Sequence, residues 1–167
     1  MAIRLLIFLV YAYMTAFCQT LLANIMAIHG IAPDFTMIII LIVVLREEFD
    51  TAYPIALTIA LIADALTPEF FGYGAFVRFG LATIIYELRQ HLNLEPWYSR
   101  LYVLIGAEVV FQLFYQLIAG GFDFGAATRV YLESSLPTLG YTAVVGFVVF
   151  FILDLDIRLD IRRRRFD

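Results

Sequence analysis

The longest uncharged segment of the chain limits its possible folds more than any other feature. Residues 5–33 include no charged side chain, and a helix of about 20 apolar residues is enough to cross a hydrocarbon core about 30 Å thick. The run is longer than the apolar core of a cleaved secretory signal, which is about 7–15 residues. Only Arg4 precedes it as a basic residue. We therefore interpret residues 5–28 as a retained membrane-spanning helix.

The composition of the whole chain agrees with a membrane location. Of its 167 residues, 63% are hydrophobic and 16% are charged, whereas about a quarter of the residues of a soluble domain are charged. A soluble fold of this size has too little interior to hide so much apolar surface. These numbers exclude a free soluble domain, a disordered chain and a nucleic-acid-binding protein. They predict an integral membrane protein with one domain.

Five more apolar segments follow the first one, separated by charged, proline-containing or glycine-rich stretches. Together they predict an all-α fold, a compact bundle of six transmembrane helices over residues 5–28, 33–45, 51–66, 72–88, 101–119 and 130–155. The segment 33–45 is short, so it either spans a thin region or re-enters. Residues 121–129 are predicted to form a glycine-rich loop. The transmembrane domain then covers residues 1–156, and residues 157–167 form a basic tail.

The distribution of arginine predicts the orientation of this bundle. All eleven basic residues are arginine, and with six spans nine of them lie on the same side as both termini, which the positive-inside rule makes the cytoplasm. We expect the last four to anchor the tail at the cytoplasmic surface of the membrane. The nine residues are Arg4, Arg46, Arg89, Arg100, Arg158, Arg162, Arg163, Arg164 and Arg165; Arg78 and Arg129 do not share their side.

Small residues recur along one face of two predicted spans. Residues four apart lie on the same face of a helix, and small side chains let membrane helices approach closely. We predict helix-packing stripes on the first and third spans. Their members are Ala12, Ala16, Ala23 and Ala27 in the first span, and Ala52, Ala56 and Ala60 in the third.

Four polar side chains of the predicted spans form a candidate intramembrane cluster, and three of them are ionisable: Asp64, Arg78, Glu108 and Gln112. A charge near the bilayer centre costs about 2.5–3.5 kcal/mol on insertion scales, so we expect Arg78 to pair with Asp64 or Glu108. One guanidinium does not neutralise two buried carboxylates, and Glu108 is therefore expected to be protonated or reached by water. The cluster either fixes the register of the helices or lines a proton or substrate path. We favour the structural interpretation for so small a chain.

Enzyme, cofactor and metal signatures do not emerge from the sequence. His29 and His91 lie far apart, and neither lies beside a serine or cysteine nucleophile in a recognisable pattern. Cys18 falls within an apolar run and is interpreted as a packing residue. We expect no catalytic residue, no metal site and no cofactor.

The order of several short motifs resembles a known family. The first span contains Gln19, and Pro33-Asp34-Phe35 opens the second apolar run. The third span ends with Leu61-Ile62-Ala63-Asp64-Ala65-Leu66, and Leu136-Pro137-Thr138 opens the last span. Over nearly the whole chain this arrangement resembles MreD, the rod shape-determining membrane protein of bacteria. One departure is Ala60, near a position where the family often has glycine.

The resemblance implies a non-enzymatic scaffold in the bacterial inner membrane that maintains rod shape within the cell-wall elongation machinery. The implied direct partner is MreC. MreB, RodA and a class B penicillin-binding protein belong to the wider complex, surrounded by membrane lipid. The family's fold is also similar to vitamin-binding S-components of energy-coupling transporters. An S-component-like subunit, with Asp64, Arg78 and Gln112 lining an outward-facing pocket, is the alternative function.

Overall fold

A computed structural model describes residues 2–66, 72–94 and 96–163, and within these ranges the chain is all-helical, with 84% helix and no strand. The predicted fold class is confirmed at this level: the protein is a helical membrane protein. The elements are α1 (Ala2–Phe17), η1 (Cys18–Leu22), α2 (Ala23–Met26), α3 (Phe35–Arg46), α4 (Phe49–Leu66), α5 (Tyr73–Leu88), α6 (Trp97–Ala119), α7 (Phe124–Val130), η3 (Tyr131–Ser135) and α8 (Leu136–Arg163).

Four helical segments among the described residues are long and apolar enough to cross a membrane: Leu6–Met26, Phe49–Leu66, Trp97–Ile118 and Tyr131–Leu155. Each of the six predicted segments contains a helix, but α3 has only 12 residues and α5 only 16. At 1.5 Å per residue, α3 is about 18 Å long, which is shorter than a hydrocarbon core. The six-span count and the side of the termini stay predictions.

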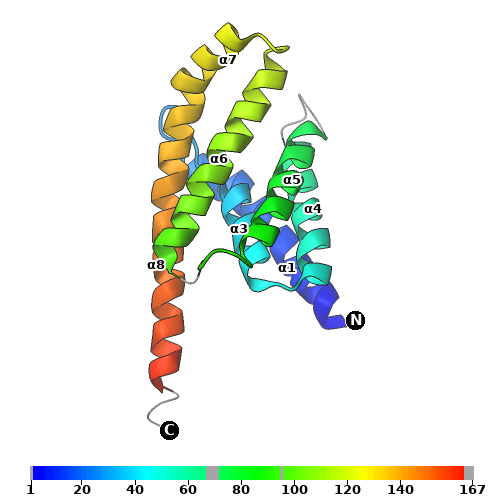
Figure 1. The fold of residues 1–167 in the computed structure, drawn as a ribbon, viewed down its shortest axis with the longest axis vertical. Coiled ribbons are helices and arrows are strands. Elements are labelled where there is room, and N and C mark those ends of the chain that lie inside the picture. Colours follow the sequence, from blue (N-terminus) through cyan, green and yellow to red (C-terminus); the bar gives the residue numbers. More distant parts are fainter. Residues whose placement is uncertain (1, 67–71, 95, 164–167) are drawn as a thin grey trace.

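The short helix α3 lies at the centre of the molecule (Figure 1). It contacts α1, α4, α5, α6 and α8, and side chains around its whole circumference are buried, among them Met37, Ile40 and Val43. A helix that is apolar all round belongs in an interior. Because protein surrounds α3, it does not need to match the thickness of the bilayer by itself.

A tight turn leads the chain from α2 toward α3. His29 and Gly30 both have positive φ, 53° and 83°, and the flanking Ile28 and Ile31 exchange two backbone hydrogen bonds of 2.9 and 3.0 Å. Positive φ at both central residues is the signature of a type I′ hairpin turn. The turn satisfies backbone groups locally. His29 is one of the two central residues of this turn.

The small-residue stripes on α1 and α4 differ in burial. Ala52, Ala56 and Ala60 on α4 are all buried, at 1%, 1% and 0% exposure. On the first span the π-helical segment η1 adds a residue per turn and rotates the faces that follow it. Ala12 and Ala16, which precede η1, are half-buried, Ala23 after it is buried, and Ala27 is exposed at the extended C-cap of α2. A single stripe from Ala12 to Ala27 was therefore the wrong geometry.

Helices α6 and α8 form a long antiparallel pair joined at one end through α7 and η3 (Figure 1). The predicted loop over 121–129 is wrong, because α7 begins at Phe124. Asp123 Oδ1 accepts a hydrogen bond from the Gly125 N–H at 2.9 Å, so an aspartate supplies the N-terminal acceptor that starts this helix. The turn before it uses positive φ at Gly121 and Phe122.

The C-terminal helix is continuous with the predicted tail. Helix α8 runs to Arg163, past the boundary predicted at residue 156. Arg162 and Arg163 belong to its last turn, whereas Arg164 and Arg165 lie outside the described residues. The first turn of α1 and the last turn of α8 both lie in the lower part of Figure 1.

We predict that Gly146→Ala destabilises the α6–α8 pair by about 1–3 kcal/mol. A Cβ at Gly146 would overlap Cδ2 of Leu104, and Leu104 is only 1% exposed, so it has no room to move away. Thermal unfolding of the purified protein in detergent measures the effect.

Gly140→Ala is the matched control on the same helix, because a Cβ there has no neighbour within 4 Å. Its unfolding temperature is expected to stay the same or to rise slightly. Equal losses for the two variants would contradict close packing at Gly146.

Candidate functional site

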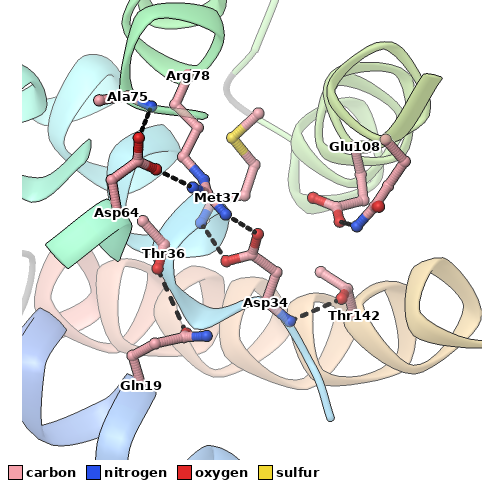
Figure 2. Close-up of polar contacts among 10 residues, drawn as sticks. Gln19, Asp34, Thr36, Met37, Asp64, Ala75, Arg78, Glu108 and Thr142 are labelled. Atoms are coloured by element: carbon pink, nitrogen blue, oxygen red, sulfur yellow. Dashed lines mark hydrogen bonds and ion pairs between the residues drawn. The ribbon is translucent and has the colours of Figure 1, made fainter. Parts of the chain in front are cut away.

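The buried polar centre of the bundle is an ion-pair cluster of three residues, Asp34, Asp64 and Arg78, which we call the central ion-pair cluster (Figure 2). Arg78 Nη2 donates to Asp34 Oδ2 at 3.0 Å, and Arg78 Nη1 donates to Asp64 Oδ1 at 3.3 Å. Exposure is 6% for Asp34, 2% for Asp64 and 9% for Arg78. One guanidinium therefore joins the start of α3, the end of α4 and the first half of α5.

Asp34 is placed by its role as the N-cap of α3. Its Oδ1 accepts a hydrogen bond from the Met37 N–H at 3.2 Å, which satisfies a free donor of the first helical turn. The backbone N–H of Asp34 donates to Thr142 Oγ1 on α8 at 2.9 Å. The residue thus connects α3 both to Arg78 and to the C-terminal helix (Figure 2).

Asp64 performs a similar task for a different helix. Its Oδ2 accepts hydrogen bonds from the Gly72 N–H at 2.9 Å and the Ala75 N–H at 2.7 Å. The N-cap residue of α5 is Gly72, which has no side chain to cap with, so a carboxylate from α4 takes that place. A negative charge at a helix N-terminus is favoured by the helix dipole. Both aspartates therefore have backbone donors in addition to Arg78.

Glu108 lies apart from the ion pairs. It is 1% exposed, and its Oε1 accepts a hydrogen bond from Gln112 Nε2 at 2.9 Å. Neither Glu108 Oε2 nor Arg78 Nε has a hydrogen-bond partner among the described residues. The Arg78 guanidinium instead stacks over Phe111 of α6, with Cζ 4.0 Å from the ring centroid, a cation–π contact.

A second polar contact links the first span to the same end of α3. Thr36 Oγ1 donates to Gln19 Oε1 at 3.3 Å, and Gln19 belongs to the π-helical segment η1. Farther along α6, Gln116 Nε2 donates to Ser135 Oγ in η3 at 3.2 Å. The polar side chains of the interior thus connect the helices to one another.

The predicted contact between Arg78 and Asp64 is present, whereas the alternative partner Glu108 pairs with Gln112. Asp34 was named only within the motif that opens the second apolar run, and its membership of the cluster was missed. The count of three interior ionisable residues was therefore one too low. A signal did exist, because the predicted topology put Asp34, Asp64 and Arg78 toward the same membrane surface.

The arrangement joins the ends of three helices. Two carboxylates and one guanidinium, each held by helix ends or by the other members, form fixed contacts among α3, α4 and α5. In the part of the chain that the structure describes, no group of three or more His, Cys, Asp or Glu side chains is placed to hold a metal ion. Comparison of the chain with protein-family models, curated proteins and solved structures finds no match.

We predict that Arg78→Met lowers the free energy of unfolding by about 3–5 kcal/mol, because it leaves two buried carboxylates without their counter-charge. Loss of folded protein after extraction in detergent, or a large drop in unfolding temperature, is the expected result. Arg129→Met is the matched control, since Arg129 pairs with Glu133 at the surface with its side chain 80% exposed. Surface pairs contribute little, so similar losses in both variants would argue against the cluster.

A second prediction concerns the close approach of α5 to Asp64. A Cβ at Gly74 would overlap Asp64 Oδ1 and lie 3.2 Å from Arg78 Nη1. Gly74→Ala is expected to lower the unfolding temperature, because the hydrogen bonds that fix Asp64 prevent it from moving away. On the same helix, Gly80→Ala meets nothing within 4 Å and is expected to leave the temperature unchanged or slightly raised. A neutral Gly74→Ala variant would contradict the close approach.

Proposed function

We propose that this protein is a non-enzymatic, six-span membrane scaffold of the bacterial cell-wall elongation machinery. In this proposal it maintains rod shape by binding MreC and by positioning the peptidoglycan synthases, with both termini in the cytoplasm of a bacterial inner membrane. MreB, RodA and a class B penicillin-binding protein belong to the wider complex. The proposal rests on the resemblance to MreD and on the arrangement of the motif residues in the bundle.

The observation that carries the proposal is the convergence of two separate motifs. Asp34 from Pro33-Asp34-Phe35 and Asp64 from the end of the third predicted span both pair with Arg78. Thr142, from the last predicted span, accepts the Asp34 N–H. The short motifs behind the resemblance therefore form one connected structure. This favours a shared fold over a chance similarity of common residues.

The pairing of the interior polar side chains favours a scaffold over a carrier of small molecules. The S-component-like alternative needs Asp64, Arg78 and Gln112 to be available to a ligand. In the structure Asp64 and Arg78 are buried and paired with each other, and Gln112 donates to Glu108. Buried groups that pair with each other cost free energy to separate. A ligand in that place would have to break these contacts first.

Short connections between the helices also favour a scaffold. Only residues 47–48 separate α3 from α4, and residues 89–96 separate α5 from α6. A chain with so little mass outside its helices meets partners through helix faces, turns and ends. Binding of the single membrane span of MreC to a helix face is compatible with a chain that consists mainly of helices.

Co-purification from detergent tests the proposal. The affinity-tagged chain, co-expressed with MreC from the same genome, is expected to retain MreC, whereas an unrelated six-span membrane protein with the same tag does not. Depletion in the native host is expected to convert rods to spheres. Absence of MreC from the purified complex, together with normal rods after depletion, would overturn the proposal. Stoichiometric recovery of a vitamin with the purified chain would instead support the alternative.

A further inference from the structure

A cavity of about 480 Å³ lies at the opposite end of α3 from the central ion-pair cluster. Its walls come from the C-terminal end of α3, the segment that follows α5, the start of α6 and the second half of α8. We call it the arginine pocket, because three of its lining residues are Arg46, Arg89 and Arg100. Its volume is within the range of about 300–1,000 Å³ that is usual for ligand sites.

Arg89 is held in place by the end of α3. Its Nη1 donates to the carbonyl oxygens of Val44 and Glu47, and its Nη2 donates to the hydroxyl of Tyr86 at 3.2 Å. Its Cζ also lies 4.2 Å from the centroid of the Tyr86 ring. A cation at a helix C-terminus complements the negative end of the dipole. These contacts orient the guanidinium, and no carboxylate in the described part of the chain forms an ion pair with it.

The other two arginines differ in how firmly hydrogen bonds hold their side chains. Arg100 Nε donates to the Leu94 carbonyl at 2.8 Å, so its position is fixed by the segment between α5 and α6. Arg46 is exposed in the last turn of α3 and makes no hydrogen bond or ion pair with any residue that the structure describes. It is free to turn toward a bound group. The chain therefore offers two fixed guanidinium groups and one movable one.

Among the residues that the structure describes, no acidic side chain lines this cavity. The lining residues within the described part of the chain are the three arginines, Asn93 and apolar side chains. Glu47 accepts a hydrogen bond from Tyr11 at 3.4 Å, and Asp154 follows a lining residue in sequence, but neither lines the pocket. Arg46 and Arg89 bring two like charges to this space, like charges repel each other, and an anion between them would lower that repulsion.

The apolar part of the lining decides which kind of anion fits. Leu45, Leu92, Leu94 and Phe150 are among the side chains on the wall, and the neighbouring part of α8 carries exposed Phe151 and Ile152. A free phosphate ion gains nothing from such a surface. A molecule with a phosphate group and an acyl chain satisfies both parts, because guanidinium groups bind phosphate with paired hydrogen bonds.

We propose that the arginine pocket binds the phosphate group of an anionic phospholipid at the membrane surface that the arginine distribution makes cytoplasmic. The headgroup lies among Arg46, Arg89 and Arg100, and the acyl chains follow the apolar wall toward α8. Basic pockets between membrane helices on the cytoplasmic side bind anionic lipid headgroups. This inference is independent of the proposed scaffold function, since it concerns lipid chemistry alone.

The single tryptophan of the chain provides a native reporter. Trp97 lies one helical turn before Arg100 on α6 and packs against Phe147 and Phe151 of α8, with ring centroids 5.1 and 6.2 Å apart. Brominated acyl chains quench tryptophan fluorescence at short range. In nanodiscs of phosphatidylcholine, a small fraction of dibrominated phosphatidylglycerol is expected to quench Trp97 more strongly than the same fraction of dibrominated phosphatidylcholine.

Substitution of the movable arginine tests the site without disturbing the fold. Arg46→Gln is expected to lower the apparent affinity for dibrominated phosphatidylglycerol about fivefold, which is the contribution of one basic residue near a membrane. Arg46→Lys keeps the charge and retains most of the effect. Arg129→Gln, the same neutralisation on the surface helix α7, is expected to leave the affinity unchanged.

Three outcomes would overturn the proposal. Equal quenching of the unsubstituted protein by the two brominated lipids means that the pocket does not select an anionic headgroup. An equal loss in Arg46→Gln and Arg129→Gln means that overall charge, not the pocket, attracts the lipid. Abolition of the excess quenching by sodium phosphate, but not by sodium chloride of the same ionic strength, means that a free ion occupies the site and the apolar wall does not contribute.

Discussion

The ion pairs of Arg78 with Asp34 and Asp64 determine how the rest of this bundle fits together. A charge of either sign is costly within a membrane protein, so each must have partners. Here the partners are also helix ends: Asp34 caps α3 and Asp64 caps α5. The same three side chains therefore satisfy buried charges and the free backbone donors of two helices. Gly74 makes this possible, because a side chain there would displace Asp64.

Helix α3 depends on polar contacts at both of its ends. At its N-terminus Asp34 supplies a negative charge, and at its C-terminus Arg89 donates to the carbonyl oxygens of Val44 and Glu47. Both charges complement the helix dipole. Between these ends α3 is almost wholly apolar and buried. A helix of only 12 residues can therefore occupy the centre of a membrane protein, where neighbouring helices replace lipid as its surroundings.

Much of the fold could be predicted from hydropathy, because a membrane makes apolar length the main determinant of where helices occur. Every predicted span contains a helix, and the pairing of Arg78 with Asp64 followed from the cost of isolated charges. Three features could not be predicted from hydropathy. The π-helical turn at Cys18–Leu22 changes the face that Ala23 presents, and no hydropathy pattern reveals an extra residue in a turn.

The helical start at Phe124 depended on one aspartate acting as a cap, a signal that the glycines around it obscured. The role of Asp34 depended on tertiary structure, because its partners Arg78 and Thr142 follow it in the chain by 44 and 108 positions. The arginine pocket is similar: its basic residues were predicted to mark membrane topology, and only the folded chain brings three of them around one cavity.

The central claim is that Arg78 offsets the free-energy cost of burying the two aspartates. A thermodynamic cycle tests it most directly: Asp34→Asn and Asp64→Asn are each introduced with Arg78 intact and together with Arg78→Met, and unfolding free energies are measured in one detergent. With Arg78 intact, each asparagine variant is expected to be destabilised, because it loses an ion pair. Combined with Arg78→Met, each is expected to be stabilising relative to Arg78→Met alone, because it removes an unpaired buried charge. The same destabilisation in both backgrounds would contradict the claim.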